Sequence, residues 1–167
     1  MNLSIQKALT DQANHELYAA HSYRAMSIWC DDQDYNGFAK FFSIQAAEEL
    51  EHADKFIRHL LDRDVLPKLT GFEAPATEFK SLIEVALLAQ TLEQRNSSNI
   101  HQCYDISLEV KDFPSQPMLM ELISEQVEEE SWASTMVNLT KRSECPGAVY
   151  NLDRHIIKEL KAEQNKA

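Results

Sequence analysis

The chain has few residues that break helices and no apolar run long enough to cross a membrane. Only three Gly and five Pro occur in 167 residues, and long stretches contain neither. This scarcity predicts a mostly helical chain. Because no run of about 18 apolar residues is present, we expect no membrane partner. The start lacks the basic-then-apolar layout of a secretory signal, which predicts a cytoplasmic location.

Paired cysteines and basic patches are also missing. Cys30, Cys103 and Cys145 are odd in number and widely spaced, which argues against a disulfide framework and against a zinc or iron–sulfur knuckle. With a formal net charge of −11 the chain lacks the basic patch that phosphate binding requires, so we expect no nucleic-acid partner. An acidic surface instead suits solubility or the attraction of cations.

Four long stretches place apolar or small residues every three or four positions, the spacing of a helix with one buried face. Turn formers or prolines separate these stretches, and a shorter apolar pattern follows Pro146 and Gly147. A chain of 167 residues has the size of one domain with a full core, so we expect residues 1–167 to form a single domain. The predicted helices span about 4–30, 38–63, 80–110, 118–141 and 151–161.

The connections between these helices define the expected topology. Helices one and two, and helices three and four, are joined by short turns, so each pair is expected to form an antiparallel hairpin. The link at about 64–79 contains Pro67, Gly71 and Pro75 and is long enough to run back along a bundle. It could instead join two hairpin domains, but each hairpin alone would bury too little. The sequence therefore predicts an all-α fold, a four-helix bundle with one long crossover and a short C-terminal fifth helix.

Each predicted long helix carries one carboxylate on its inward face, near its middle. Helices packed side by side would bring these four groups to one level, whichever way each helix runs. His52 lies one turn from Glu49 on the same face, and Gln126 stands in the same relation to Glu129. The four inward carboxylates belong to Glu16, Glu49, Glu93 and Glu129.

The same spacing occurs in both halves of the chain. Glu16 and Glu49 are 33 positions apart, as are Glu93 and Gln126, and a further candidate ligand follows three positions after each pair. Both halves thus follow one template, a carboxylate and then ligand-x-x-ligand. In the duplicated di-iron template each half reads Glu with Glu-x-x-His, so the second half of this chain is an altered copy.

A metal centre explains these carboxylates better than surface charge does. A single Glu on a helix is usually a solvated surface group, and a lone Glu-x-x-His says little about metal. Four carboxylates at one buried level would repel one another or take up protons. Bound cations would offset that repulsion, and carboxylate oxygens with one imidazole suit iron, with zinc or manganese as competitors.

Four motifs contain these positions: Asn14–Tyr18 followed by Tyr23, Glu48–Ala53, Leu92–Gln94 and Ser124–Glu130. In them the chain resembles the ferritins, above all the haem-free bacterial ferritins, and the resemblance covers nearly its whole length. It implies a homo-oligomeric hollow shell of twenty-four chains, iron as the bound metal, and ferroxidase activity toward Fe(II) with dioxygen or peroxide. It also implies storage of the oxidised iron as mineral.

The resemblance implies a role for each ligand position of this chain. Glu16 and His52 would bind the first iron, and Glu49 would bridge it to the second. Glu93 and Glu129 would bind the second iron.

Two further residues and a third iron site follow from the same resemblance. Gln126 would lie beside the metals on the dioxygen side, and Tyr23 would hydrogen-bond the centre and could lend an electron. A looser third site would use Glu48, Glu125, Glu128 and the shared Glu129. Helical spacing permits that site, although an acidic surface is the alternative for its three additional glutamates.

Related classes of protein differ from this chain at particular positions. Bacterioferritin has a His where Glu129 stands and binds haem through a Met where Leu50 stands, so we expect no haem. Rubrerythrin-type di-iron oxidases or peroxidases usually add a Cys-rich domain, which is missing. A catalytically silent structural bundle would have disrupted ligands, whereas all the principal ligands are present. Particle size and Fe(II) oxidation would separate these alternatives.

Two expectations concern the shell. Ferritins commonly line a threefold iron-access channel with acidic residues, but the matching positions appear as Gln116 and Leu119, and Asp112 or Glu121 would have to substitute. The fifth helix is expected to line a fourfold axis, with a plain capping helix as the alternative. Its apolar residues are Leu152, Ile156, Ile157 and Leu160.

Overall fold

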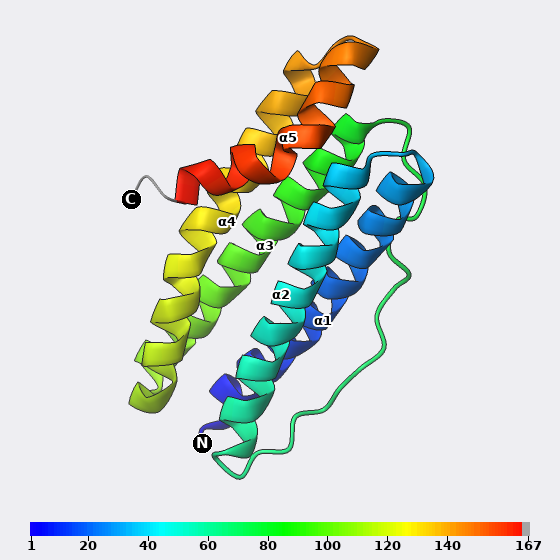
Figure 1. Cartoon of the computed structure of the whole chain (residues 1–167). Helices are drawn as coiled ribbons and strands as arrows, with labels where there is room; N and C mark the ends of the chain where they lie inside the picture. Colours follow the sequence, from blue (N-terminus) through cyan, green and yellow to red (C-terminus); the bar gives the residue numbers. More distant parts are fainter. Residues whose placement is uncertain (165–167) are drawn as a thin grey trace.

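Five α-helices and one short 3₁₀ turn make up the chain in the computed structural model, which describes the backbone of residues 1–164 and the side chains of residues 1–160 (Figure 1). Within these residues there is no strand, and no helix is long and apolar enough to cross a membrane. The elements are α1 (Leu3–Asp32), α2 (Asn36–Leu61), α3 (Leu82–Glu109), η1 (Phe113–Ser115), α4 (Gln116–Arg142) and α5 (Pro146–Gln164).

The four long helices form two antiparallel hairpins joined by a long crossover, which confirms the predicted fold. α1 packs on α2 and α3 packs on α4, while the crossover at 62–81 runs beside α1 from the end of α2 to the start of α3 (Figure 1). Asn14 of α1 donates to the carbonyl of Lys68 at 3.0 Å and accepts from the amide of Thr70 at 2.8 Å. These contacts fix the crossover to the bundle, so it does not serve as a linker between two hairpin domains.

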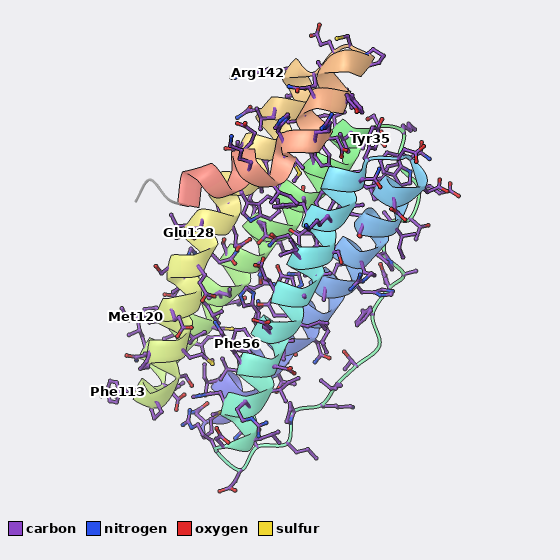
Figure 2. All side chains as sticks on the ribbon, in the orientation of Figure 1. Tyr35, Phe56, Phe113, Met120, Glu128 and Arg142 are labelled. Carbon is purple, nitrogen blue, oxygen red and sulfur yellow. The ribbon has the colours of Figure 1, made fainter. Side chains whose placement is uncertain are left out.

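The apolar core falls into two parts along the bundle. One part lies toward α5 and includes Phe38 and Met136, and the other lies toward the α3–α4 turn and includes Phe56 and Leu119. Phe56 points into the bundle from α2, whereas the side chain of Phe113 is exposed at the α3–α4 turn (Figure 2). Between the two parts, the middle of each long helix contributes polar side chains, and this layer holds the candidate site.

The boundaries of the four long helices agree with the prediction to within two residues. The fifth helix differs more, because it begins at Pro146 instead of near 151. Proline suits the first turn of a helix, where its missing N–H would have no intrahelical partner and its fixed φ is already helical. Pro146 and Gly147 therefore belong to the first turn of α5 and do not precede the helix.

α5 crosses the end of the bundle and packs against α2 and α4 (Figure 1). Three of its apolar side chains are at most 8 % exposed within the single chain, and Ile157 packs against the same core. The expectation that this set lines a fourfold axis is therefore wrong for the three, because burial within their own chain leaves them no surface for an axis. They are Leu152, Ile156 and Leu160.

A close approach between α5 and the start of α2 depends on Gly37. Oδ1 of Asp153 accepts from the N–H of Gly37 at 2.9 Å and of Phe38 at 3.1 Å, capping a helix whose own N-cap residue provides no side-chain hydrogen bond. A Cβ on Gly37 would lie 1.8 Å from the Asp153 carbonyl oxygen. Only glycine permits this contact, which also brings a carboxylate to the positive end of the α2 dipole.

The opposite end of the bundle is joined by an ion pair. Arg63, just after α2, donates to the two carboxylate oxygens of Asp112 at 2.5 and 2.7 Å, and the Ser115 hydroxyl also donates to Asp112. The hydrogen bond from Arg63 is the main reason why the pKa of Asp112 lies below its usual value. Asp112 is buried in this pair and Leu119 is fully buried in the core, so neither is placed to line a channel.

Candidate metal centre

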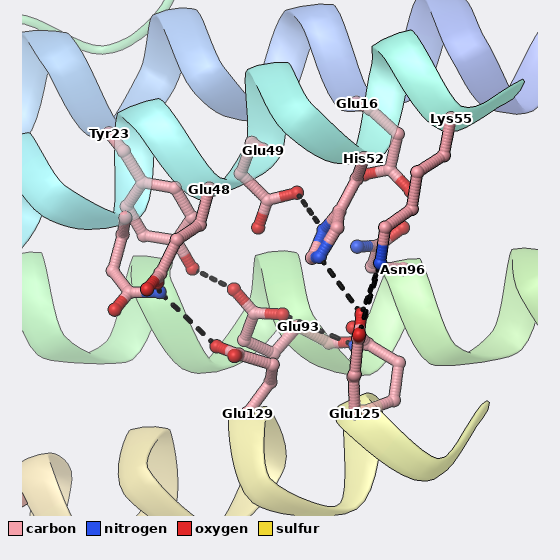
Figure 3. A network of polar contacts seen from close by, with 12 residues as sticks. Glu16, Tyr23, Glu48, Glu49, His52, Lys55, Glu93, Asn96, Glu125 and Glu129 are labelled. Carbon is pink, nitrogen blue, oxygen red and sulfur yellow. Dashed lines mark hydrogen bonds and ion pairs between the residues drawn. The ribbon is translucent and has the colours of Figure 1, made fainter. Parts of the chain in front are cut away.

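Carboxylates from all four long helices meet in the polar layer between the two parts of the core (Figure 3). Three of them, Glu16, Glu49 and Glu93, are at most 1 % exposed, and Glu129 is half-buried. His52 is 8 % exposed and lies one turn after Glu49 on α2. The spacing of the sequence therefore brings these five side chains to one level, although the helices run in opposite directions.

One group within this layer already has the arrangement of a metal site. Glu16 of α1 and Glu49 and His52 of α2 each offer a ligand atom, and these atoms lie within 4.8 Å of one another. Nδ1 of His52 is 3.4 Å from Oε2 of Glu49. Two carboxylates and an imidazole at this spacing can coordinate a divalent cation of the iron, zinc or manganese type.

Hydrogen bonds orient Glu16 and leave one of its oxygens unused. Gln12, one turn earlier on α1, donates to Oε1 of Glu16 at 2.8 Å and to Asn96 of α3 at 2.5 Å. Oε2 of Glu16 is buried and has no hydrogen-bond partner among the described residues. A buried carboxylate oxygen without a donor is costly, and a coordinated cation would satisfy it.

Neutral donors hold the carboxylate of Glu93 on α3. The hydroxyl of Tyr23 donates to its Oε1, and Nε2 of Gln126 donates to its Oε2 at 3.2 Å. Gln126 also donates to the hydroxyl oxygen of Ser97 at 3.1 Å. The Gln126 amide therefore lies beside Glu93 as Glu49 lies beside Glu16 in the other half of the chain, in agreement with the internal repeat.

The carboxylate of Glu129 is held by side chains from two helices. Nε1 of Trp132, one turn further along α4, donates to its Oε2, and Nε2 of Gln45 on α2 approaches the same oxygen at 3.3 Å. Gln45 also donates to Glu48 at 2.6 Å. Donors of this kind fix the direction in which a ligand carboxylate points.

Burial dominates the electrostatics of the layer and disfavours its negative charge. It raises the pKa of Glu16 and of Glu49 well above the usual value, and a neighbouring carboxylate adds to each shift. It also raises the pKa of Glu93 to about 7 and, together with the charge of Glu93, that of Glu129 to about 8. The pKa of Tyr23 is raised mainly by burial, which keeps its phenol protonated as a donor. Positive charge within the layer would stabilise the ionised carboxylates and lower these pKa values.

The three additional glutamates of the expected third site are not gathered around one point. Glu48 lies beside Gln45, on the Glu129 side of the layer, whereas Glu125 lies at the His52 side (Figure 3). Oε2 of Glu125 is 3.2 Å from Nε2 of His52. Glu128 is exposed on α4 (Figure 2).

A lysine shares Glu125 with this centre. Nζ of Lys55 lies 3.0 Å from Oε1 of Glu125 and 3.0 Å from Oε1 of Glu121. Burial lowers the pKa of Lys55, but its hydrogen bonds to Glu121 and Glu125 raise it by more, so the ammonium stays charged. Glu121 is therefore already engaged in an ion pair within its own chain.

Several residues of the centre were not singled out as site residues from the sequence, although helical spacing contains them. Trp132 follows Glu129 by three positions, and Gln12 precedes Glu16 by four, so each shares a face with a predicted ligand. Lys55 likewise follows His52 by three. Spacing identifies such neighbours but cannot tell which of them turns toward the ligand.

A four-helix bundle with one long crossover and a buried carboxylate–imidazole cluster at its middle defines the ferritin-like class of proteins. Residues 6–143 match the family described as Ferritin-like domain. The chain belongs to the ferritin family.

Its relatives include bacterial proteins of nearly the same length. The chain is 34 % identical over 157 residues to the bacterial non-heme ferritin of Staphylococcus aureus (strain USA300), covering 93 % of this chain and 95 % of that one. It is 37 % identical over 142 residues to the bacterial non-heme ferritin of Staphylococcus haemolyticus (strain JCSC1435), covering 85 % and 86 %. These relatives confirm the resemblance to haem-free bacterial ferritins.

A solved structure with the same fold comes from an archaeon. The open pore ferritin of the hyperthermophile Archaeoglobus fulgidus aligns with a TM-score of 0.89 at 29 % identity, covering 93 % of this chain and 96 % of that one. The fold of this chain is thus that of a ferritin along almost its whole length.

Proposed function

We propose that this chain stores iron, oxidising Fe(II) with dioxygen at a di-iron centre in its bundle and passing Fe(III) to a mineral inside a hollow shell. The buried group of Glu16, Glu49 and His52 is the observation that carries this proposal. Family membership and relatives named non-heme ferritin support iron over zinc or manganese as the cation.

The donors of the layer would hold two cations. Glu16 and His52 would hold one Fe(II), and Glu93 and Glu129 would hold the other. Glu49 lies beside Glu16, and the charge of Glu93 raises its pKa, as expected of a carboxylate that would be shared by the two cations. Pairs of metals held by shared carboxylates can act on one substrate together.

The chemistry requires two electrons from two irons. Each Fe(II) gives one electron and becomes Fe(III), and dioxygen takes up the two electrons and two protons to leave as hydrogen peroxide. Carboxylates favour this change because they stabilise the more positive ion. Gln126 contributes a neutral amide where a fifth carboxylate would hold Fe(III) more tightly, and the Tyr23 hydroxyl holds Glu93 in place through its hydrogen bond.

Oxidation kinetics test the centre directly. After aerobic addition of two Fe(II) per chain, the absorbance of Fe(III) should rise rapidly, and the initial rate should fall at least about tenfold in His52→Ala or Glu49→Ala. Glu51→Ala is the matched control, because Glu51 lies exposed on the same helix and should leave the rate unchanged. Equal rates in wild type and His52→Ala would disprove the proposed centre.

The shell is tested by particle mass. We expect purified protein to run as a particle of twenty-four chains and to retain many irons per chain after oxidation. A dimer that oxidises iron without retaining it would favour a di-iron oxidase or peroxidase of the rubrerythrin type. A particle that binds no iron would favour a structural bundle.

A further inference from the structure

A buried amide beside the proposed position of the first iron has a hydrogen-bond donor that the protein does not use. Asn96 is 1 % exposed on α3, and its Nδ2 has no hydrogen-bond partner among the described residues. Figure 3 shows Asn96 at the His52 side of the polar layer, where Glu16 also lies. A buried donor without an acceptor costs stability, and a bound ligand that accepts from it would remove that cost.

Two hydrogen bonds determine which way the Asn96 amide faces. Nε2 of Gln12 donates to Oε1 of Glu16 at 2.8 Å and to Oδ1 of Asn96 at 2.5 Å. An ionised carboxylate only accepts, so Gln12 presents its NH₂ group to Glu16. The same NH₂ group requires the oxygen of Asn96, which leaves the NH₂ group of Asn96 directed elsewhere. Glu16 thus orients Asn96 through Gln12, and the unused donor is a consequence of this network.

The unused donor belongs to a side chain next to the candidate metal ligands. Glu16 and Asn96 both accept from one nitrogen of Gln12, so their side chains lie close together. Oε2 of Glu16, which would face the first iron, is also buried without a partner. In contrast, the amide nitrogen of Gln126 on the other side of the layer is already engaged by Glu93. Asn96 is therefore free to donate to a ligand of the first iron.

We propose that Asn96 hydrogen-bonds the oxidant at the first iron, donating from Nδ2 to dioxygen as it gains negative charge and becomes hydrogen peroxide. The inference rests on the proposed function, in which dioxygen takes up two electrons from two Fe(II) together with two protons. Asn96 keeps its own proton throughout and contributes a hydrogen bond alone. A donor that is already in place where charge develops stabilises that charge without the cost of reorientation.

Azide binding tests this donor without turnover, because azide is a small anion that can occupy the position of the reduced oxidant. Anaerobic addition of azide to the Co²⁺-loaded protein is followed by the visible absorption of Co²⁺. Asn96→Leu removes the donor and keeps the size of the side chain. It should weaken azide binding about tenfold, as expected for the loss of a hydrogen bond to a charged acceptor, and leave the affinity for Co²⁺ unchanged.

Asn99→Leu is the matched control for this substitution. Asn99 is half-buried one turn further along α3, so the variant makes the same chemical change in the same helix. Its affinity for azide should equal that of wild type. A crystal structure of the wild-type Co²⁺–azide complex provides a check that needs no variant, and it should place an azide nitrogen about 3 Å from Nδ2 of Asn96.

Three results would overturn the inference. The first is equal azide affinity in wild type and Asn96→Leu while both bind Co²⁺. The second is Co²⁺-loaded wild type that binds no azide, or binds it away from Asn96. The third is equal weakening in Asn99→Leu, which would assign the effect to a general change in α3. Failure of wild type to bind Co²⁺ among Glu16, Glu49 and His52 would instead refute the proposed function, and the inference with it.

Discussion

Neutral donors orient the buried carboxylates of the centre, whereas burial limits the negative charge that the centre holds without metal. Tyr23 and Gln126 donate to Glu93, and Trp132 donates to Glu129. These donors favour the ionised forms, yet burial outweighs them and raises the pKa of Glu93 to about 7 and of Glu129 to about 8. Near neutral pH the metal-free layer therefore holds protons that a divalent cation would displace.

The metal-free protein should become less stable as pH rises from 5 to 8. A carboxyl whose pKa is raised on folding adds no penalty below its unfolded value of about 4.5 and its full penalty above its folded value. The pKa of Glu93 places this loss between pH 4.5 and about 7, and that of Glu129 extends it to about 8. Melting temperatures of the metal-free protein by circular dichroism measure the loss, which Co²⁺ should largely reverse at pH 8.

Two variants separate this effect from general charge repulsion. Glu93→Gln removes one of the buried titrating groups and should flatten the dependence on pH, whereas Glu51→Gln removes an exposed carboxylate and should not. A metal-free protein that gains stability between pH 5 and 8 would contradict the raised pKa values.

Gln126→Glu tests the neutral side of the centre. The change replaces a donor to Glu93 by a second carboxylate at 3.2 Å, so the metal-free variant should lose about 1–3 kcal/mol of stability at pH 8. Iron should be held more tightly after oxidation and reach an external chelator more slowly. Turnover and iron release equal to those of wild type would show that the amide has no such role.

The sequence predicts the level and identity of the central carboxylates, because helical periodicity decides which positions face inward. It does not predict their hydrogen-bond partners. Trp132 and Lys55 both follow a predicted ligand by three positions, yet one donates to its neighbour Glu129 and the other reaches across to α4. Such choices depend on rotamers and on helix separation, which spacing does not contain.

At the scale of helices, the junction of α5 with α2 depends on a single glycine. Gly37→Ala would place a Cβ 1.8 Å from the Asp153 carbonyl oxygen, and a backbone atom cannot yield as a flexible side chain would. We expect a loss of about 1–3 kcal/mol, since α5 must shift away and weaken its cap on α2. Thermal unfolding of both chains measures the change.

Gly147→Ala provides the control for this substitution. A Cβ at Gly147 meets nothing within 4 Å, and the residue lies in the first turn of α5, where alanine is the better helix former. Its melting temperature should match or exceed that of wild type. Equal stability of Gly37→Ala and wild type would mean that α5 is not held at this contact.

The four long helices could be predicted closely, whereas α5 could not. Long helices repeat the inward pattern over many turns, so a boundary error of two residues leaves each face intact. The fifth helix is short, and its opening Pro146 and Gly147 look like a break. The contact of Asp153 with Gly37 joins positions 116 apart, so no local pattern reveals it.

Across the whole molecule, a polar layer divides the apolar core. Its residues are those proposed to bind metal, and they lower the stability of the metal-free fold. Apolar side chains on either side of it, such as Phe42 and Phe56, are fully buried and supply cohesion. The layer between them contains carboxylates that burial makes costly to ionise. Divalent cations should bind the folded chain but not the unfolded one, and so stabilise the fold by mass action. Metal loading and folding are therefore linked.

Anomalous diffraction from crystals of the assembled protein, loaded anaerobically with Fe(II), tests this account most directly. We expect two iron peaks in each bundle, one bounded by Glu16, Glu49 and His52 and the other by Glu49, Glu93 and Glu129. Iron confined to the protein surface, with no peak among these carboxylates, would contradict it.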